Sequence, residues 1–195
     1  MNYSLNFDFT KGSLRYRCDH LQGTNELIAK AIGFKNSPLT IFDVTAGLGR
    51  EAFLLAALGN EVTLFERNST VAQQLKNNLK KALIDPQLVS IISRMKLIEI
   101  CAIAFLQNLS NNECPDIIYC DPMFPPRKKS ALVKKEMQYL QKVVGEDKDA
   151  DLLIEIAIQK AKRRVVVKRP PYAPSYTRPH ITYKARTHCF DIFIK

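Results

Sequence analysis

The residues best suited to chemistry lie in the pentapeptide DPMFP at positions 121–125. It follows the run DIIYC at 116–120, and an apolar run rich in β-branched and aromatic residues predicts a buried strand. Pro122 ends that strand sharply and stiffens the chain that follows. We therefore expect Asp121 at the carboxyl end of a strand, where ligand crevices of open α/β sheets form, with the ring of Phe124 three residues on.

This arrangement suits methyl transfer to the exocyclic amine of a nucleobase. Such an amine is a poor nucleophile because its lone pair is delocalised into the ring. The carboxylate of Asp121 and nearby main-chain carbonyls can accept its N–H bonds and favour the pyramidal, nucleophilic form. Phe124 can stack on a flipped or single-stranded base. A strand that ends at a proline-rich turn with a capping Asp explains the same residues without chemistry, so the rest of the chain must decide.

The whole chain has the composition of one globular domain. It has 195 residues, of which 46% are hydrophobic and 25% charged. No apolar run approaches membrane-spanning length, and the polar opening MNYSLNFDFTKG is no signal peptide. The five cysteines and three histidines show no paired zinc spacing, so we expect no metal site and reduced thiols in a cytoplasm.

The net charge of +10 is unevenly distributed. Residues 1–126 carry 12 Lys and Arg against 12 Asp and Glu, whereas residues 127–195 carry 17 against 7. Each of these cations taken alone is explained by a solvated surface, but the confinement of the excess after the pentapeptide favours a polyanion beside the site. The candidate RNA-binding residues are Lys128, Lys129, Lys134, Lys135, Lys168 and Arg169.

Strands and helices alternate along the chain, which predicts a doubly wound, mostly parallel sheet. The expected strands are 39–44, 61–66, 96–100, 116–120 and 163–168, with a terminal antiparallel hairpin of 181–184 and 189–194. The expected helices are 24–33, 52–59, 69–83, 87–93, a segment from 130, and one that follows a loop and cap at 147–151 and extends to about Lys162. Residues 1–22 are interpreted as an N-terminal arm or a small hairpin around Gly12, and 23–195 as a single domain.

A glycine turn after the first strand indicates a nucleotide cofactor. Gly47 and Gly49 let the backbone approach a ligand closely and tolerate positive φ. Glu66 ends the second strand, where an acid can accept hydrogen bonds from both ribose hydroxyls. Gly47-x-Gly49-x-x-Ala52 with Glu66 also resembles a dinucleotide fingerprint, so an NAD-dependent oxidoreductase remains an alternative function. Asp43, a buried acid inside the first strand, instead suits a cofactor with a cationic amino-acid part.

An Asp-Pro-x-Phe motif at the fourth strand, with a closing hairpin, resembles the Rossmann-like class I S-adenosylmethionine methyltransferases. The match is closer than that superfamily. The segments DVTAGLGREAF, LFERN, YCDPMFP, KKSALVKKEM and RRVVVKRPPYAP closely resemble the RsmJ family, bacterial guanine-N2 methyltransferases of small-subunit ribosomal RNA. The resemblance extends from about Phe7 to the C-terminus. Family members usually carry a further N-terminal segment, and their small hydroxyl pair after strand three is here Cys101-Ala102.

The resemblance implies S-adenosylmethionine as the cofactor and the N2 amine of a guanosine in 16S ribosomal RNA, free or in the small subunit, as the target. In the family the acid before the glycine turn, here Asp43, lies near the methionine moiety, and Asp121, Pro122 and Phe124 occupy the motif of amino methylation. The implied cofactor contacts are Arg50, Glu51, Glu66, Arg67, Cys101, Ala102 and Asp121. A non-catalytic RNA-binding protein that kept the fold remains the second alternative.

Overall fold

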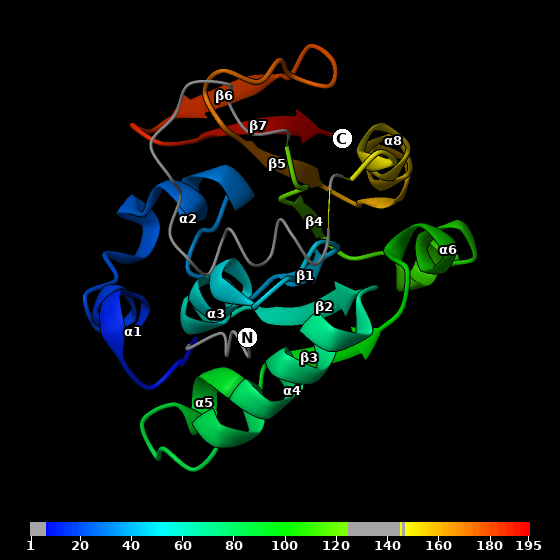
Figure 1. Ribbon diagram of the computed structural model, residues 1–195. Coiled ribbons are helices and arrows are strands. Elements are labelled where there is room, and N and C mark those ends of the chain that lie inside the picture. Colours follow the sequence, from blue (N-terminus) through cyan, green and yellow to red (C-terminus); the bar gives the residue numbers. More distant parts are fainter. Residues whose placement is uncertain (1–6, 125–144, 146) are drawn as a thin grey trace.

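The computed structural model describes residues 7–124, 145 and 147–195, and Figure 1 shows their arrangement. Seven strands form one sheet. They are β1 (Thr40–Asp43), β2 (Glu61–Glu66), β3 (Met95–Glu99), β4 (Ile117–Cys120), β5 (Arg164–Arg169), β6 (Ile181–Lys184) and β7 (Cys189–Ile194). The helices are α1 (Gly12–Asp19), α2 (Leu27–Ile32), α3 (Arg50–Ala57), α4 (Ser69–Ala82), α5 (Val89–Ile92), α6 (Ala102–Gln107) and α8 (Ala150–Lys160), with short 3₁₀ turns at Gly23–Asn25 and Asn111–Glu113.

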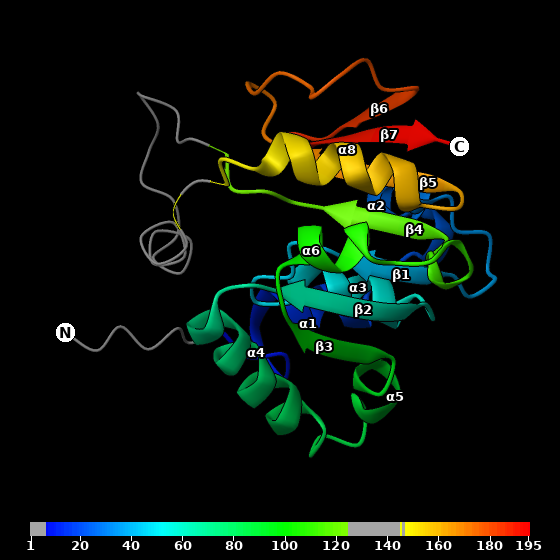
Figure 2. The ribbon, with the colours of Figure 1, turned by 90° about the vertical axis from the view of Figure 1, so that its right-hand side faces the viewer.

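The strand order is β3-β2-β1-β4-β5-β7-β6. The first five strands run parallel, and β7 is inserted antiparallel between β5 and β6. The mostly parallel sheet with a C-terminal antiparallel pair confirms the predicted fold class. Figures 1 and 2 show the sheet crossing the molecule from β3 at one edge to the β6–β7 hairpin at the other. Because the chain reverses its direction of winding at β1 and β4, the carboxyl ends of these two strands bound a ligand crevice.

Helices cover both faces of the sheet, and each face has its own hydrophobic core. Alternate residues of β4 show the division: Ile117 and Tyr119 pack with α1 to α5, whereas Ile118 and Cys120 pack with α6 and α8. In Figure 1, α2 and α3 accordingly lie on one side of the strands and α6 and α8 on the other. Burial on both faces explains why β4 is apolar at every position.

The N-terminal hairpin prediction is wrong, because residues 12–19 form helix α1. Phe9 is fully buried and packs on Phe53 of α3 with 4.9 Å between ring centroids. Arg15 then pairs with Asp19 one helical turn on, and it also bonds Asp85 near α5. Phe7 and Phe9, which precede Gly12, therefore anchor the start of the helix to the core, and they do not alternate along a strand.

The other predicted elements agree with the structure to within a few residues, and β2 agrees at both ends. Gly33 ends α2 in the left-handed conformation at φ 70°, as its position predicted. The short helix α6 was not predicted, and the helix expected from residue 130 lies outside the described residues. Within the described ranges, no helix is long and apolar enough to cross a membrane, and no group of three or more His, Cys, Asp or Glu is arranged to hold a metal ion.

Candidate active site

Two hollows meet at the carboxyl ends of β1, β2, β3 and β4. The first hollow is bounded by the ends of β2 and β3, α6 and the start of α8, and its lining includes Glu66, Ala102 and Leu153. The second hollow lies over β4 and β5, beside the start of α3, and its lining includes Glu51 and Phe124. The two linings share Thr45, Gly47, Asp121 and Met123. A ligand in the first hollow can therefore reach a ligand in the second.

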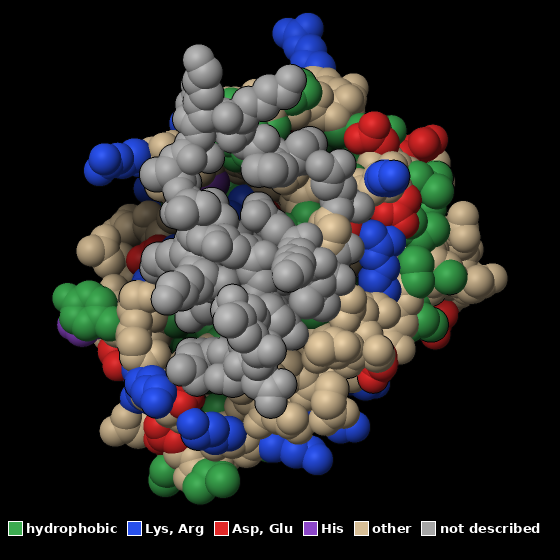
Figure 3. All heavy atoms as spheres, viewed as in Figure 1, with side chains coloured by type: hydrophobic (Ala, Val, Ile, Leu, Met, Phe, Trp, Pro, Cys, Tyr) green, Lys and Arg blue, Asp and Glu red, His purple; other side chains and the backbone are tan. Residues whose placement is uncertain are grey.

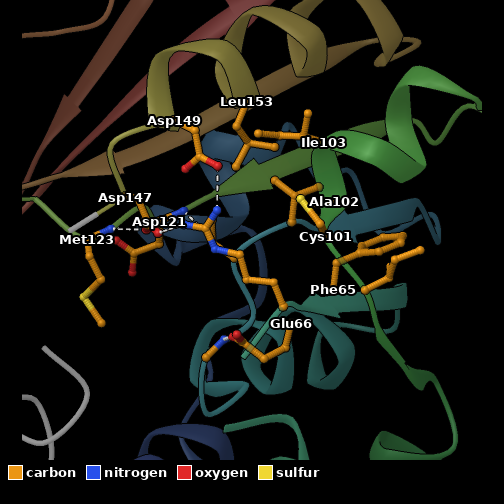
Figure 4. A pocket seen from close by; sticks show the side chains of 15 residues that line it. Phe65, Glu66, Cys101, Ala102, Ile103, Asp121, Met123, Asp147, Asp149 and Leu153 are labelled. Carbon is orange, nitrogen blue, oxygen red and sulfur yellow. Dashed lines mark hydrogen bonds and ion pairs between the residues drawn. The ribbon is translucent and has the colours of Figure 1, made fainter. Parts of the chain in front are cut away.

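The first hollow has an apolar side and an acidic side, as Figure 4 shows. Phe65, Ala102, Ile103 and Leu153 line one side, and Asp121, Asp147 and Asp149 line the other, with Glu66 below them. Such a combination suits a flat aromatic ring joined to hydroxyl-bearing groups.

Glu66 connects the glycine turn to the end of β2. One carboxylate oxygen accepts a hydrogen bond of 2.9 Å from the Gly47 N–H, and the other accepts one of 2.7 Å from the Asn68 N–H. Burial raises the pKa of Glu66 above its ordinary range, and the two N–H donors oppose that shift. Each oxygen retains a lone pair for a further donor, as a ribose diol requires.

The two glycines of the turn have different roles. Both have positive φ, 53° at Gly47 and 74° at Gly49. A Cβ at Gly49 would lie 2.9 Å from Leu75 Cδ1, so this residue is needed where the turn packs on α4. A Cβ at Gly47 would approach nothing nearer than the Thr45 carbonyl oxygen at 4.0 Å, and Gly47 lines both hollows. Gly47 thus keeps the wall of the site open, whereas Gly49 allows close packing.

Arg67 joins the end of β2 to the start of α8. Its guanidinium donates hydrogen bonds of 2.5 Å to Asp147 and 2.6 Å to Asp149. Asp147 also accepts the Met123 N–H at 2.7 Å, so it links the segment after β4 to Arg67. Asp149 lies in the stretch 147–151 that the sequence predicts as the loop and cap before this helix. It occupies the N-cap position, but its side chain makes no capping hydrogen bond and pairs with Arg67.

Asp121 is held from two sides where the hollows meet. Its N–H donates a 2.6 Å hydrogen bond to Thr45 Oγ1, and one carboxylate oxygen accepts a 2.7 Å hydrogen bond from Lys168 Nζ. Lys168 also donates a 2.5 Å hydrogen bond to Glu51 at the start of α3. Burial raises the pKa of Asp121 to about 6; Lys168 opposes that shift and Glu51 adds to it.

The ammonium group of Lys168 also determines the pKa of Glu51. Burial alone would raise the pKa of Glu51, but Lys168 outweighs burial and lowers that pKa below its ordinary range. Burial alone would lower the pKa of Lys168, but Asp121 and Glu51 together raise it. Lys168 is thus a permanent cation shared by two carboxyl groups, of which Glu51 is the more readily ionised.

Asp43 lies under the second hollow and is only 2% exposed. One carboxylate oxygen accepts the Thr45 N–H at 3.2 Å. Burial raises the pKa of Asp43 to about 8, the Thr45 N–H opposes the shift, and the charges of Glu51 and Asp121 add to it. Tyr119 is paired with Asp43 in the sheet, and its buried hydroxyl has no hydrogen-bond partner within the described ranges.

The structure brings together most of the residues predicted to bind the cofactor. Glu66, Arg67, Cys101 and Ala102 line the first hollow, Asp43, Arg50 and Glu51 line the second, and Gly47 and Asp121 line both. Pro122 and Phe124 also line the second hollow, as their expected catalytic position requires. Gly49 lines neither hollow.

The predicted RNA-binding residues form no comparable group. Lys128, Lys129, Lys134 and Lys135 lie outside the described residues. Lys168 is paired with two carboxylates, and Arg169 bonds Asp191, so their charges are compensated inside the protein and phosphate contact by either stays an untested prediction. Apart from the atoms drawn in grey, Lys and Arg side chains in Figure 3 are spread around the visible face among acidic ones.

Three contributions to the site were not predicted: the hydrogen bond from Asp121 to Thr45, the pairing of Arg67 with the acids before α8, and the pairing of Lys168 with Asp121. Thr45 carried a signal, because it directly follows the first strand. Lys168 carried one as well, since it lies two residues after Val166 and therefore on the face of β5 that Val166 shares with Tyr119.

Comparison with known proteins agrees with this geometry. The family model described as "Putative SAM-dependent methyltransferase" matches residues 2–195. The ribosomal RNA small subunit methyltransferase J of Histophilus somni is 44% identical over 192 residues, which cover 96% of this chain and 75% of the relative. The protein of that name from Aeromonas salmonicida is 45% identical over 191 residues, covering 96% and 76%. The crystal structure of a SAM-dependent methyltransferase from Neisseria gonorrhoeae superposes with a TM-score of 0.76 at 36% identity, covering 96% and 73%.

The parallel sheet with its antiparallel closing strands, and the acid that follows β4, define a class I methyltransferase, whose cofactor is S-adenosylmethionine. The chain belongs to the family of the ribosomal RNA small subunit methyltransferases J. The comparisons support neither an NAD-dependent oxidoreductase nor a non-catalytic RNA-binding protein.

The described residues fit that cofactor. The free lone pairs of Glu66 suit a ribose diol, the apolar side of the first hollow suits an adenine ring, and the missing Cβ of Gly47 leaves the passage between the hollows open. The buried carboxyl group of Asp43 lies in the second hollow, where a cationic amino-acid group would stabilise its ionised form.

Proposed function

We propose that this protein transfers a methyl group from S-adenosylmethionine to the exocyclic N2 amine of a guanosine in 16S ribosomal RNA. The observation that carries the proposal is the position of Asp121. It follows β4 where the two hollows meet, it is fixed by Thr45, and its carboxylate is paired with Lys168. The names of the relatives support RNA of the small ribosomal subunit as the substrate.

In this proposal Asp121 orients and activates the target amine. Its ionised carboxylate accepts an N–H bond of the amine, which turns the nitrogen lone pair toward the methyl donor and favours the pyramidal form. When bound, S-adenosylmethionine supplies an electrophilic methyl group. The new N–C bond forms as the sulfur–methyl bond breaks, and the electron pair of the broken bond stays on the sulfur of the leaving group, S-adenosylhomocysteine. The amine also loses one proton, which Asp121 accepts or passes to water. Phe124, which lines the second hollow together with Asp121, stacks on the guanine.

The remaining residues hold the cofactor and bring the RNA to the site. Glu66 binds the ribose hydroxyls, and Asp43 binds the amino group of the methionine part. The positive excess of residues 127–195 attracts the phosphate backbone and makes binding dependent on salt. We place the reaction in the cytoplasm, where ribosomal RNA is assembled into the small subunit.

The proposal is tested by incubating the protein with labelled S-adenosylmethionine and either 16S RNA or small subunits from cells that lack this activity. Nucleosides from the digested RNA are then separated by mass spectrometry against standards. N2-methylguanosine is the expected product, and labelled 1-methylguanosine, 7-methylguanosine or a methylated adenosine would overturn the assignment of the amine. Asp121→Ala should lose the product while still binding S-adenosylhomocysteine in a calorimetric titration. Full methylation by that variant would remove Asp121 from catalysis.

A further inference from the structure

A third hollow continues from the second toward helix α8. It lies between α8 and the loop of residues 170–176 that follows β5. Phe124, Arg169 and Tyr172 line both this hollow and the second one. A polymer that places one unit beside Asp121 therefore has a path for its next unit over Phe124 and into the third hollow.

The third hollow has an apolar floor and an aromatic rim. Ile154 of α8, Val167 of β5 and Ala173 of the loop are buried beneath it. Tyr172 and Tyr176 line it from the loop, and they remain 49% and 37% exposed. A ring that is half exposed beside an apolar floor offers a face on which a planar group can stack.

The loop is held in shape by the protein itself. Arg169 Nη1 donates a 2.7 Å hydrogen bond to the Ala173 carbonyl, and its Nε donates one of 2.6 Å to Asp191 of β7. Asp191 is 1% exposed and also accepts a 2.7 Å hydrogen bond from Thr182 Oγ1. The loop also contains Pro170, Pro171 and Pro174, which restrict its backbone. The aromatic rim is thus preorganised, which lowers the entropic cost of binding.

The charges around the third hollow distinguish between ligands. Arg169 is compensated by Asp191, while Asp151 lines the hollow and is exposed. Among the described lining residues the uncompensated charge is negative, so these residues do not favour a phosphate. A nucleobase with N–H donors on its edge gains both a stacking face and an acceptor.

We infer that the third hollow binds the nucleobase next to the target guanosine in the RNA chain, by stacking on Tyr172 and Tyr176 with Asp151 accepting an N–H from its edge. This inference rests on the proposed function, since the path over Phe124 begins at the target base. It makes the protein a reader of two adjacent bases in a single-stranded or opened RNA, and Arg169 a positioning residue for the loop.

Fluorescence can test the stacking without any methyl transfer. The chain contains no tryptophan, so Tyr172→Trp gives a reporter with a single indole in the hollow. The probe is the hexanucleotide r(AAGAAA), compared with an oligomer of the same length that keeps the guanosine and has abasic sites in place of the adenosines. The adenine-bearing probe should quench the indole by about half or more on saturation, and the abasic one, which has the same phosphates, should not. Tyr16→Trp, on the exposed face of α1, is the matched reporter and should respond to neither.

Kinetics separates this inference from the proposed function. Tyr172→Ala should raise the KM for RNA by roughly 10- to 100-fold, with the loss in KM and not in kcat, because stacking on one aromatic ring is lost. Tyr172→Phe keeps the ring and should restore most of the lost affinity. Equal quenching by the two oligomers would overturn the base-binding role even if methyl transfer occurs. Displacement of the probe by tetramethylammonium would do so as well, because it would show that the aromatic rim binds an organic cation and not a base. Absence of methyl transfer together with selective quenching would overturn the proposed function alone.

Discussion

Lys168 of β5 donates a 2.7 Å hydrogen bond to Asp121, the acid that follows β4. Strands β4 and β5 are adjacent and parallel, and the same ammonium group reaches Glu51 of α3. The charge state of Asp121 is therefore influenced by a residue of the neighbouring strand β5. The second carboxylate, Glu51, competes for the same cation.

The pairing predicts a shift in the pH dependence of methyl transfer. Asp121 acts as an acceptor only when it is ionised, so activity should fall as the pH falls through about 6. Lys168→Met removes the cation that lowers the pKa of Asp121, so this pKa should rise by roughly 1–3 units and the acidic limb of the profile should move to higher pH with it. The measurement is kcat/KM against pH. The control is Lys96→Met, which changes an exposed lysine of β3 and should keep the acidic limb of the wild type. If the limb of Lys168→Met does not move, Asp121 is not the group that sets it.

Asp43 predicts how stability depends on pH. Its folded-state pKa of about 8 lies above the ordinary value of 3.8, so the folded protein binds the proton more tightly than the unfolded chain does. The free energy of unfolding should therefore decrease as the pH rises from about 4 to about 8. Asp43→Asn keeps an oxygen for the Thr45 N–H and removes the charge.

The check is the melting temperature of both proteins from pH 5 to pH 9. The melting temperature of the variant relative to that of the wild type should increase as the pH rises, because all other titrating groups are common to the two chains. A difference that stays constant across this range would mean that Asp43 is ionised at low pH in the folded protein.

The two glycines of the turn should separate stability from cofactor binding. Gly49→Ala places a methyl group 2.9 Å from Leu75 Cδ1 at φ 74°, so the free energy of unfolding should fall by about 1–3 kcal/mol. Gly47→Ala costs about 1 kcal/mol of backbone strain, but it adds a methyl group to the wall of both hollows. Its affinity for S-adenosylhomocysteine should fall by at least ~10-fold, as a closer wall displaces the ligand. Thermal melts and calorimetric titration distinguish the two variants, and equal effects of both would contradict this division.

Asp147 and Asp149 both pair with Arg67, but only Asp147 also accepts the Met123 N–H. Asp147→Ala should therefore weaken S-adenosylhomocysteine binding by roughly 10-fold. The substitution removes the hydrogen bonds that join the segment after β4, at Met123, to Arg67 at the end of β2. Asp149→Ala removes an ion pair with partners 39% and 40% exposed and should change the affinity by less than about threefold. If the two variants behave alike in calorimetry, the backbone contact of Asp147 has no role in shaping the hollow.

S-adenosylhomocysteine should stabilise the protein, and NAD should not. At a concentration 100 times the dissociation constant, a ligand that binds only the folded protein adds about 2.7 kcal/mol to the free energy of unfolding. For a chain of this length that corresponds to a rise of roughly 5–10 °C in the melting temperature. Stabilisation by NAD alone would contradict the cofactor assigned to the family.

Periodicity and turn chemistry predicted most of the fold. The run from Glu61 to Glu66 is bounded by Gly59 on one side and by the cap of α4 on the other, and local signals of this kind identify a strand without tertiary information. The same reasoning failed at Gly12. Whether the flanking aromatic residues form a strand or anchor a helix depends on the pocket that α3 provides for Phe9.

The part of the site that directly follows strands was predicted, whereas the part that depends on tertiary contacts was not. Gly47, Glu66 and Asp121 follow strands directly, so the topology of the sheet brings them together. Lys168 was interpreted as a contact for RNA because it lies in a basic stretch, yet its partner Glu51 is 117 positions away in the chain. Strand alternation gives the face of the sheet on which Lys168 lies, but only the folded structure shows that the carboxylate of Glu51, at the start of α3, lies within hydrogen-bonding distance of Lys168.

The position of β7 has a consequence for protein synthesis. Strand β5 carries Lys168, and its second neighbour in the sheet is β7, residues 189–194, which leaves the translating ribosome after every other described element. Until β7 has paired, β5 is an open edge and the cation for Asp121 is anchored on one side only. A nascent chain can thus form its cofactor hollow while the pair of Lys168 and Asp121 lacks the support of β7, and the site is complete only after β7 has paired with β5.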